Sequence, residues 1–223
     1  MRLFSKKDSK VDLTKKVEEV KKVCLMKKPL QNLIANVGTV LDYSGSMDTL
    51  YRNGTMQGVV ENLLPLAMNF DDNGTMESWI FDTNFHRLSD ITLNNLFGYI
   101  PRETKRYSMG GTYYAPVMRD ILNTYKGNKI PAYIIFITDG ANSDKAETDA
   151  IVKEAARYPI FWQFVGIGNA RFDYLQSLDD MTDRYVDNAD FFQVRSIGDI
   201  TYDKLLTEFP SCLQNPKVVD MLK

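Results

Sequence analysis

Cysteine and histidine are both scarce in this sequence of 223 residues. The two cysteines are Cys24 and Cys212, whereas a secreted domain of this length more often carries a larger disulfide framework. We therefore expect two buried thiols, with a single Cys24–Cys212 bridge as the alternative. The one histidine is His86, and no positioned base partner is visible for it in the sequence, so histidine-dependent acid–base chemistry is not expected.

Long apolar segments are absent as well. The longest apolar runs are a handful of residues, such as 134–137, whereas a transmembrane helix needs about 20. The sequence opens on Met-Arg-Leu-Phe-Ser-Lys-Lys-Asp, which lacks the apolar core of a signal peptide. These absences predict a cytoplasmic protein with no transmembrane segment.

Charge is divided unevenly along the chain, although the formal net charge is only −2. Residues 1–28 hold ten Lys or Arg and four Asp or Glu, a balance of +6, and the remainder holds 17 basic and 25 acidic residues, a balance of −8. A basic arm of this kind can contact nucleic acid, a membrane or an acidic partner. We prefer the simpler interpretation, in which the lysines line the solvent face of a helix, and we expect no nucleic acid partner.

Strand patterns alternate with helix patterns throughout the chain. The expected strands are 33–41, 77–81, 85–88, 131–138 and 160–167, and a final strand lies within 185–194. The expected helices are 11–26, 50–70, 92–100, 113–125, 145–158, 172–178 and 198–209. This alternation predicts an α/β fold with a doubly wound, mostly parallel sheet and helices on both faces. The short strand at 85–88 should pair antiparallel at one edge, and Pro65 should kink or break the helix at 50–70.

The pattern divides the chain into three parts. Residues 1–28 form a basic N-terminal segment with an amphipathic helix, residues 29–210 form the α/β domain, and residues 211–223 form a C-terminal tail. We expect the apolar stripe of the N-terminal helix to pack on the domain or to dock to a partner. The members of this stripe are Leu13, Val17, Val20 and Cys24.

The most informative stretch is the turn Asp42-Tyr-Ser-Gly-Ser46, which follows the first expected strand. Open α/β sheets bind ligands at the carboxyl ends of their strands. Asp42, Ser44 and Ser46 supply one carboxylate and two hydroxyls, and such hard oxygen donors suit Mg²⁺, Mn²⁺ or Ca²⁺ rather than zinc or copper. Gly45 lets the turn fold tightly enough for the two hydroxyls to converge. Taken alone, the stretch fits a helix N-cap made by Ser44, Ser46 or Asp48 equally well.

Two further polar segments lie downstream. Gly110-Gly111-Thr112 precedes an expected helix, and Asp139-Gly140 ends the most apolar expected strand. On its own, the Gly-Gly-Thr segment is better explained as a helix start capped by Thr112, but the aspartate–serine turn reverses that preference. Because the carboxyl ends of parallel strands meet at one edge of a sheet, all three segments are expected to converge.

Together these residues resemble the metal-ion-dependent adhesion site of the von Willebrand factor A (vWA) domain, written Asp-x-Ser-x-Ser, then a distant Thr and a distant Asp. The matching residues are Asp42, Ser44, Ser46, Thr112 and Asp139. The resemblance implies that the three hydroxyls bind the metal, while the two aspartates act through water or as outer ligands. Mg²⁺ is the implied ion, with Mn²⁺ or Ca²⁺ as alternatives.

Within that family the sequence is most similar to the vWA domain of bacterial tellurium-resistance proteins. The segments that carry the likeness are 40–47, 110–117 and 161–168. The likeness covers roughly residues 30–210, which makes the 29–210 part a vWA domain by resemblance. It also implies a role in a stress response or in a complex at the membrane surface, and we expect the protein by itself to be a monomer.

Three functional hypotheses follow. The first is a metal-dependent protein-binding module, since in the vWA family an Asp or Glu of a partner fills the open coordination position of the metal. The second is a metal-dependent hydrolase or phosphatase, but Ser44 replaces the second aspartate of an Asp-x-Asp site, and neither a nucleophile elbow nor a P-loop occurs. The third is a metal-free scaffold with a vestigial site, against which the five intact donors argue. We therefore predict a binding module and not an enzyme.

Overall fold

Six strands form one sheet in the part of the chain that the computed structural model describes, which comprises residues 6–71, 73–140 and 142–223. The strands are β1 (Asn36–Asp42), β2 (Glu77–Phe81), β3 (Phe85–Arg87), β4 (Ala132–Thr138), β5 (Ile160–Ile167) and β6 (Ala189–Val194). Their order across the sheet is β3-β2-β1-β4-β5-β6, and every pair is parallel except β2 with β3. This confirms the mostly parallel sheet with one short antiparallel edge strand.

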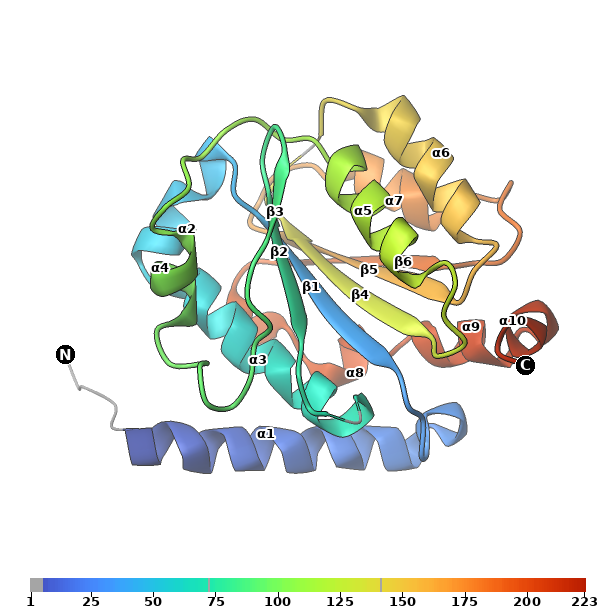
Figure 1. The fold of residues 1–223 in the computed structure, drawn as a ribbon, viewed down its shortest axis with the longest axis horizontal. Helices are drawn as coiled ribbons and strands as arrows, with labels where there is room; N and C mark the ends of the chain where they lie inside the picture. The colour runs from blue at the N-terminus through green and yellow to red at the C-terminus, as the bar shows by residue number, and fades with distance from the viewer. Residues whose placement is uncertain (1–5, 72, 141) are drawn as a thin grey trace.

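Helices cover both faces of the sheet, as predicted (Figure 1). In chain order they are α1 (Lys6–Met26), α2 (Asp48–Arg52), α3 (Thr55–Phe70), α4 (Tyr99–Thr104), α5 (Ala115–Tyr125), α6 (Lys145–Ala155), α7 (Asp173–Asp179), α8 (Tyr202–Leu205), α9 (Phe209–Gln214) and α10 (Pro216–Met221). Short 3₁₀ turns form η1 (Lys28–Leu30), η2 (Gly45–Met47) and η3 (Ile197–Asp199). The helices α5, α6 and α7 pack on one face, and α1, α3 and α8 lie on the other side.

The central strands are apolar on both faces because both faces are buried. All seven residues of β4 are buried. Tyr133, Ile135 and Ile137 belong to the core beneath α3, whereas Ile134 and Phe136 belong to the core beneath α5 and α6. A strand covered on both sides reads as a continuous apolar run, which is why β4 and β5 were evident in the sequence.

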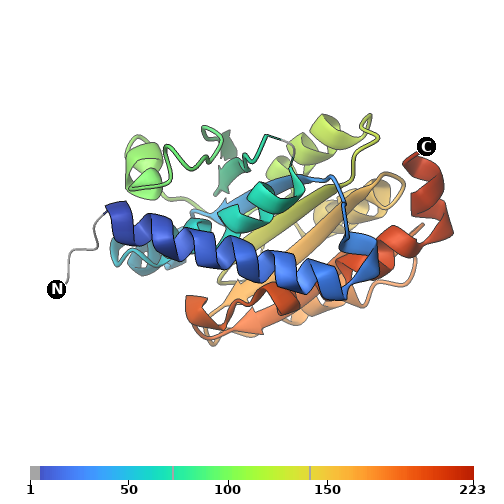
Figure 2. The same cartoon turned by 90° about the horizontal axis from the view of Figure 1, so that it is seen from below.

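The N-terminal helix packs on the domain through the predicted stripe. Leu13, Val20 and Cys24 are buried and Val17 is half-buried, and α1 contacts both α3 and α8 (Figure 2). The Lys27 ammonium, just after α1, donates to the Leu206 carbonyl over 3.1 Å and pairs with Asp203 at 3.2 Å, so the end of α1 is tied to the end of α8.

The start of that helix differs from the prediction. It begins at Lys6 rather than at residue 11, because lysine has a favourable helix propensity and extends the helix beyond the apolar stripe. Residues 1–5 of the basic segment lie outside the described residues.

Both cysteines are free thiols, which rules out the Cys24–Cys212 bridge. Cys24 is buried against the domain and Cys212 is half-buried. Among the described residues, no helix combines the length and the apolar character that crossing a bilayer requires.

The predicted helix at 50–70 is broken at glycine rather than at proline. Gly54 has a φ of +83° and separates α2 from α3, since a left-handed residue ends an α-helix. The helix α3 continues through Pro65, whose side chain is buried with those of its neighbours. The core contacts of α3 therefore outweigh the loss of one backbone hydrogen bond at Pro65.

The predicted helix at 92–100 is also wrong. The Thr92 N–H donates to Asn95 Oδ1 over 2.8 Å, and the Asn95 N–H donates to Thr92 Oγ1 over 3.3 Å, so the two side chains hold a local turn. The helix α4 begins only after Gly98, which has a φ of +62°. Pro101 lies in its first turn, where an amide donor is not needed.

The strand β6 lies within residues 185–194, where the sequence predicts a strand. The helix predicted at 198–209 is reduced to η3 and α8. Two further helices, α9 and α10, follow, and each has a buried apolar residue, such as Leu213 in α9 and Val218 in α10.

Replacing Val20 by alanine tests how α1 contributes to stability. Val20 is fully buried, so Val20→Ala should lower the free energy of unfolding by roughly 2 kcal/mol through lost burial and a residual cavity. The exposed neighbour Lys22 supplies the control, because Lys22→Ala should change stability by less than about 0.5 kcal/mol. Urea denaturation of both variants measures the difference, and equal stabilities would show that α1 is not part of the cooperative fold.

Candidate metal centre

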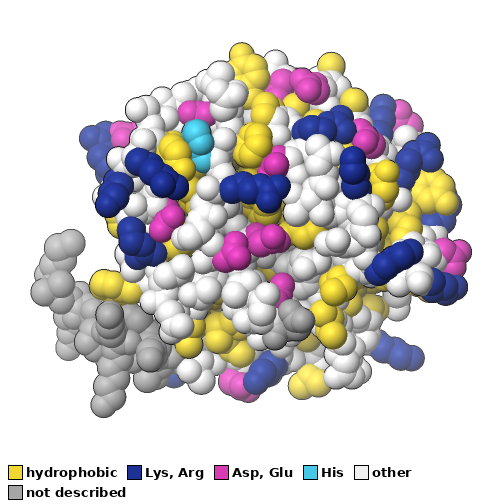
Figure 3. Space-filling model, viewed as in Figure 1, with side chains coloured by type: hydrophobic (Ala, Val, Ile, Leu, Met, Phe, Trp, Pro, Cys, Tyr) yellow, Lys and Arg dark blue, Asp and Glu magenta, His cyan; other side chains and the backbone are white. Residues whose placement is uncertain are grey.

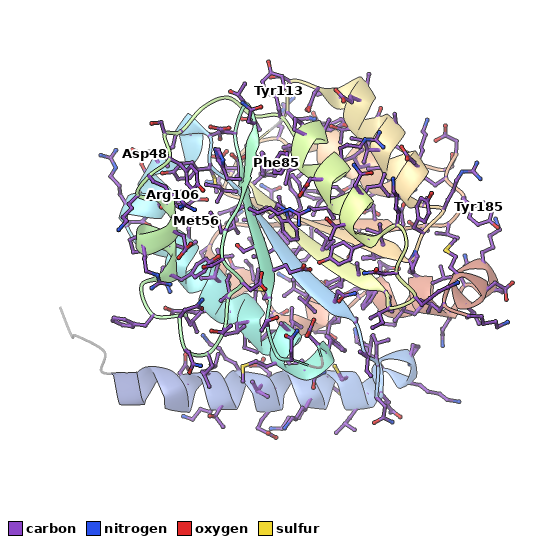
Figure 4. All side chains as sticks on the ribbon, viewed as in Figure 1. Asp48, Met56, Phe85, Arg106, Tyr113 and Tyr185 are labelled. Carbon is purple, nitrogen blue, oxygen red and sulfur yellow. The ribbon has the colours of Figure 1, made fainter. Side chains whose placement is uncertain are left out.

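The carboxyl edge of the sheet brings together the segments that follow β1 and β4 and the loop before α5. Ser44 and Gly110 form a parallel bridge outside the named strands. The Thr112 carbonyl accepts a hydrogen bond from the Ser143 N–H over 2.9 Å, which ties the same loop to the segment after β4. Figure 4 shows Tyr113 at this upper end of the molecule. The three segments that the sequence predicts to converge are therefore neighbours.

Four of the five predicted ligand residues are joined by hydrogen bonds. Ser44 Oγ lies 3.0 Å from Ser46 Oγ, and Ser46 Oγ donates to Asp139 Oδ1 over 2.8 Å. The Ser44 N–H donates to Asp42 Oδ1 over 2.8 Å. Ser46 is exposed and Asp139 half-buried, whereas Ser44 is buried and Asp42 fully so, so the group runs from the surface into the sheet.

The spacing of these oxygens fits a small divalent cation. Mg²⁺ binds six oxygens at 2.0–2.1 Å in an octahedron, in which adjacent ligands lie about 2.9 Å apart. The separation of 3.0 Å between the two serine hydroxyls equals that spacing, which is also an ordinary hydrogen-bond length, so the two hydroxyls are close enough to share one cation. Among the described residues, no group of three or more His, Cys, Asp or Glu side chains is arranged to hold a metal. A cation at this edge would therefore depend on the hydroxyls.

The fifth residue, Thr112, lies in the converging loop, but its hydroxyl is not part of the hydrogen-bonded group. The Thr112 hydroxyl forms no hydrogen bond with any residue in the described ranges. The side chain is partly exposed. Only the backbone of Thr112 is thus fixed at the site, through the bond to Ser143.

The helix-cap alternative is wrong for both serines. Ser44 precedes η2, but its side chain accepts no capping hydrogen bond. The Ser46 hydroxyl points to Asp139 instead of to a backbone amide. Asp48 lies in the first turn of α2, where it forms an ion pair with Arg52.

Burial sets the electrostatics of Asp42. Its side chain is fully buried, and this desolvation raises the pKa of Asp42 to about 6 from its ordinary value of 3.8. Hydrogen bonds from Ser44 and from Thr138, which donates to Asp42 Oδ2 over 2.6 Å, lower the pKa, and the nearby Asp139 raises it. The hydrogen bonds to Asp42 therefore stabilise its charged form, but they do not fully offset the cost of burying the charge.

Two tyrosines, Tyr43 and Tyr51, hold the turn at residues 42–46 in place through their hydroxyl groups. The Tyr51 hydroxyl donates to the Asp42 carbonyl over 2.9 Å, and the Tyr43 ring meets the Tyr51 ring edge-on with centroids 4.9 Å apart. The Tyr43 hydroxyl reaches the carbonyls of Thr104 and Tyr107 at 3.4 and 3.3 Å. The segment after α4 is thereby held against the turn that carries the serines.

Glycine at position 110 is required by close packing. A Cβ there would lie 2.9 Å from both Asp82 Oδ2 and Thr83 Oγ1, which is closer than real Cβ contacts. The Gly111 N–H donates to Thr83 Oγ1 over 3.0 Å, and the Gly45 N–H donates to the Gly110 carbonyl over 3.2 Å. The loop can therefore lie against the β2–β3 turn without a shift of the Asp82 or Thr83 side chain, because position 110 has no Cβ.

Three supporting residues at the site were not identified from the sequence. The Tyr114 hydroxyl lies 3.1 Å from Thr138 Oγ1 and donates to the Gly140 carbonyl over 2.6 Å. Asp144 accepts from the N–H groups of Tyr114 and Ala115 over 3.0 and 2.7 Å, so it caps α5 from the segment after β4. The only sequence signal was their place beside the Gly-Gly-Thr and Asp-Gly segments, since the pairings depend on which strands lie together.

Comparison with known proteins gives matches over most of the chain. The family model of vWA domains found in the TerF C terminus matches residues 34–221. The protein YcbR of Bacillus subtilis (strain 168), described as uncharacterized, is 41% identical over 218 residues, which cover 93% of this chain and 88% of YcbR.

Solved structures with low sequence identity share the fold. The SpRpn10 VWA domain has a TM-score of 0.56 at 13% identity and covers 73% of this chain and 88% of its own. The manganese-loaded TRAP protein of Plasmodium vivax has a TM-score of 0.54 at 16% identity, and the match covers 73% of this chain and 69% of the TRAP chain. The chain spans about half the length of some other matches. Proximal thread matrix protein 1 from the mussel byssus has a TM-score of 0.56 at 16% identity, and the match covers 81% of this chain and 47% of that protein.

The raised pKa of Asp42 predicts a pH-dependent stability in the absence of metal. Below about pH 4 the carboxyl is protonated in both the folded and the unfolded chain, whereas between about pH 4 and pH 6 only the unfolded chain releases the proton. The contribution of Asp42 to stability should therefore fall by about 3 kcal/mol as the pH rises through this window. Asp42→Asn should lack that decline.

The measurement is urea denaturation in EDTA at several pH values between these limits. The wild type should lose stability relative to Asp42→Asn as the pH rises, and the difference should level off above the folded pKa of about 6. Parallel curves for the two proteins would show that Asp42 ionises at its ordinary pKa.

Proposed function

Since the chain belongs to the family of vWA domains found in the TerF C terminus, we propose that it is a protein-binding module that acts through a divalent cation at the carboxyl edge of its sheet. The family membership confirms the resemblance of the sequence to a vWA domain of this type. The observation that carries the proposal is the run of Ser44, Ser46 and Asp139 oxygens at separations of 3.0 and 2.8 Å, which opens to solvent at Ser46.

In this proposal the hydroxyls of Ser44, Ser46 and Thr112 hold the ion. Asp139 and Asp42 orient the serines, because Asp139 accepts from the Ser46 hydroxyl and Asp42 accepts from the Ser44 N–H. When bound, Mg²⁺ would supply positive charge and an open coordination position for a carboxylate. Mn²⁺ is an alternative, supported by the manganese-loaded TRAP protein of the same fold, and Ca²⁺ is another.

The partner is proposed to be a protein that presents an Asp or Glu side chain. Hydroxyl ligands neutralise little cationic charge, so a carboxylate is favoured over a neutral group. We propose a tellurium-resistance-type or stress-response complex as the setting, because the sequence resembles the vWA domain of tellurium-resistance proteins. We propose that the chain is a monomer when no partner is bound and that it binds no nucleic acid.

The arrangement supports binding rather than catalysis. His86, the one histidine, stacks on Tyr107 with ring centroids 4.0 Å apart. It forms no hydrogen bond with Ser44 or Ser46, both of which lie in the described part of the chain. The Ser46 hydroxyl donates to the carboxylate of Asp139 and not to a histidine, so neither serine has the histidine base that activates a serine nucleophile.

Metal binding is tested by thermal unfolding in EDTA and in Mg²⁺, Mn²⁺ or Ca²⁺. A metal at a hundred times its Kd should raise the stability of the wild type by about 2.7 kcal/mol, and the rise should vanish in Ser44→Ala/Ser46→Ala. Ser108→Ala is the matched control, because Ser108 is an exposed serine of the neighbouring loop and should leave the rise unchanged. A rise of equal size in the double variant would place the metal elsewhere.

Partner binding is tested by capture on the immobilised chain from an extract of the cells that make it. The partner should bind in Mg²⁺, elute in EDTA and be lost with Ser44→Ala/Ser46→Ala but not with Ser108→Ala. Replacing a single Asp or Glu of the captured protein by its amide should then abolish binding. Capture that persists in EDTA would contradict a metal-dependent contact.

A further inference from the structure

Large apolar side chains are exposed at the end of the molecule opposite the candidate metal centre. Ile34 precedes β1 and Ile130 precedes β4, so both lie at the amino-terminal edge of the sheet. We call these two residues, together with Leu25 and Met26 at the end of α1 and Val219 in α10, the apolar corner. Their exposed fractions are 69% for Leu25, 77% for Met26, 55% for Ile34, 43% for Ile130 and 41% for Val219.

Two hollows lie beside the apolar corner, and Leu25 and Val219 are the members of the corner that line them. One hollow lies beside α1 and is lined by Leu25, Leu30 and Leu33. The other lies between η1 and the last helices and is lined by Pro29, Leu33 and Val219. Leu33 lines both hollows and so links the end of α1 to α10, although polar side chains, including those of Asn32 and Gln214, also line them.

Lysines border this surface. Lys21 lines the first hollow and Lys28 the second, and Lys129 reaches the end of α10 by donating to the Met221 carbonyl over 3.4 Å. Lys22 and Lys28 are exposed and form no ion pair with any residue in the described ranges. Figure 3 shows hydrophobic side chains beside lysine or arginine at the lower right of the molecule.

We propose that the apolar corner docks on an anionic lipid membrane surface. Exposed aliphatic side chains gain by entering the boundary between lipid headgroups and acyl chains, and lysines around them are attracted to the lipid phosphates. The chain would lie on the membrane rather than cross it. This docking does not depend on the metal centre or on its proposed partner.

Two other occupants fit the surface less well. A second copy of the chain would bring the unpaired Lys22 and Lys28 of both molecules together, and like charges at an interface cost free energy. A single amphipathic helix would need one continuous groove, whereas Leu25 and Met26 of α1 and Ile34 before β1 each expose more than half of their surface. Projecting side chains with a basic border fit a lipid surface.

The test is co-sedimentation of the full chain with lipid vesicles. One set of vesicles contains phosphatidylcholine alone, and the other contains equal parts of phosphatidylcholine and phosphatidylglycerol. The chain should bind only the anionic vesicles, and less strongly as salt rises, because salt screens exposed charges. Leu25→Ser/Met26→Ser should lower the partition coefficient at least about tenfold. Lys22→Glu/Lys28→Glu should lower it about thirtyfold or more.

Matched control variants distinguish docking through the apolar corner from nonspecific adsorption to the vesicles. Leu93→Ser/Phe97→Ser removes two exposed apolar side chains outside the apolar corner, and Lys105→Glu/Arg171→Glu reverses two exposed charges toward the opposite edge of the sheet. Both variants should bind like the wild type. All four double variants alter exposed side chains and should keep the wild-type melting temperature.

Three results would overturn the proposal. The first is a wild type that binds neither kind of vesicle, which would leave the surface to a protein partner. The second is equal binding by the wild type and Leu25→Ser/Met26→Ser. The third is a dimer in light scattering that dissociates in the same variant, which would assign the apolar corner to self-association.

Discussion

The buried carboxylate of Asp42 is the constraint on which the rest of the candidate site depends. It ends β1, accepts from the Ser44 N–H, and also accepts from Thr138 at the end of the neighbouring strand β4. An unpaired charge at that depth would be strongly unfavourable, so both donors must stay in place. The bond from the Ser44 N–H also holds the start of the turn that carries the two serine hydroxyls.

The sheet supplies the rigidity that this arrangement needs. Its central strands are buried on both faces, and the loops at the carboxyl edge are tied to each other through the Ser44–Gly110 bridge and the Tyr114–Gly140 bond. Side chains from three distant parts of the sequence are thereby held within hydrogen-bonding distance before any ligand arrives. A site formed in this way loses little conformational entropy when it binds.

Local patterns in the sequence predicted the fold and most of the candidate site. The turn from Asp42 to Ser46 was evident because the oxygen donors are close in sequence, and β4 was evident because it is apolar throughout. The roles of Thr138 and Asp144 were not, since each depends on a residue brought near by strand pairing. The helix bounds near Gly54 and near the Thr92–Asn95 turn were predicted wrongly. A left-handed backbone at Gly54 and side-chain hydrogen bonds between Thr92 and Asn95 interrupt helices that the spacing of apolar residues predicts.

The tie between Lys27 and the end of α8 has a consequence for biosynthesis. A ribosome makes α1 early, but the carbonyl of Leu206 and the carboxylate of Asp203 become available only after about 180 further residues have been added. The apolar stripe of α1 can begin to pack when α3 emerges, yet its contact with α8 must wait. Until α8 has been made, the apolar face of α1 is therefore only partly covered.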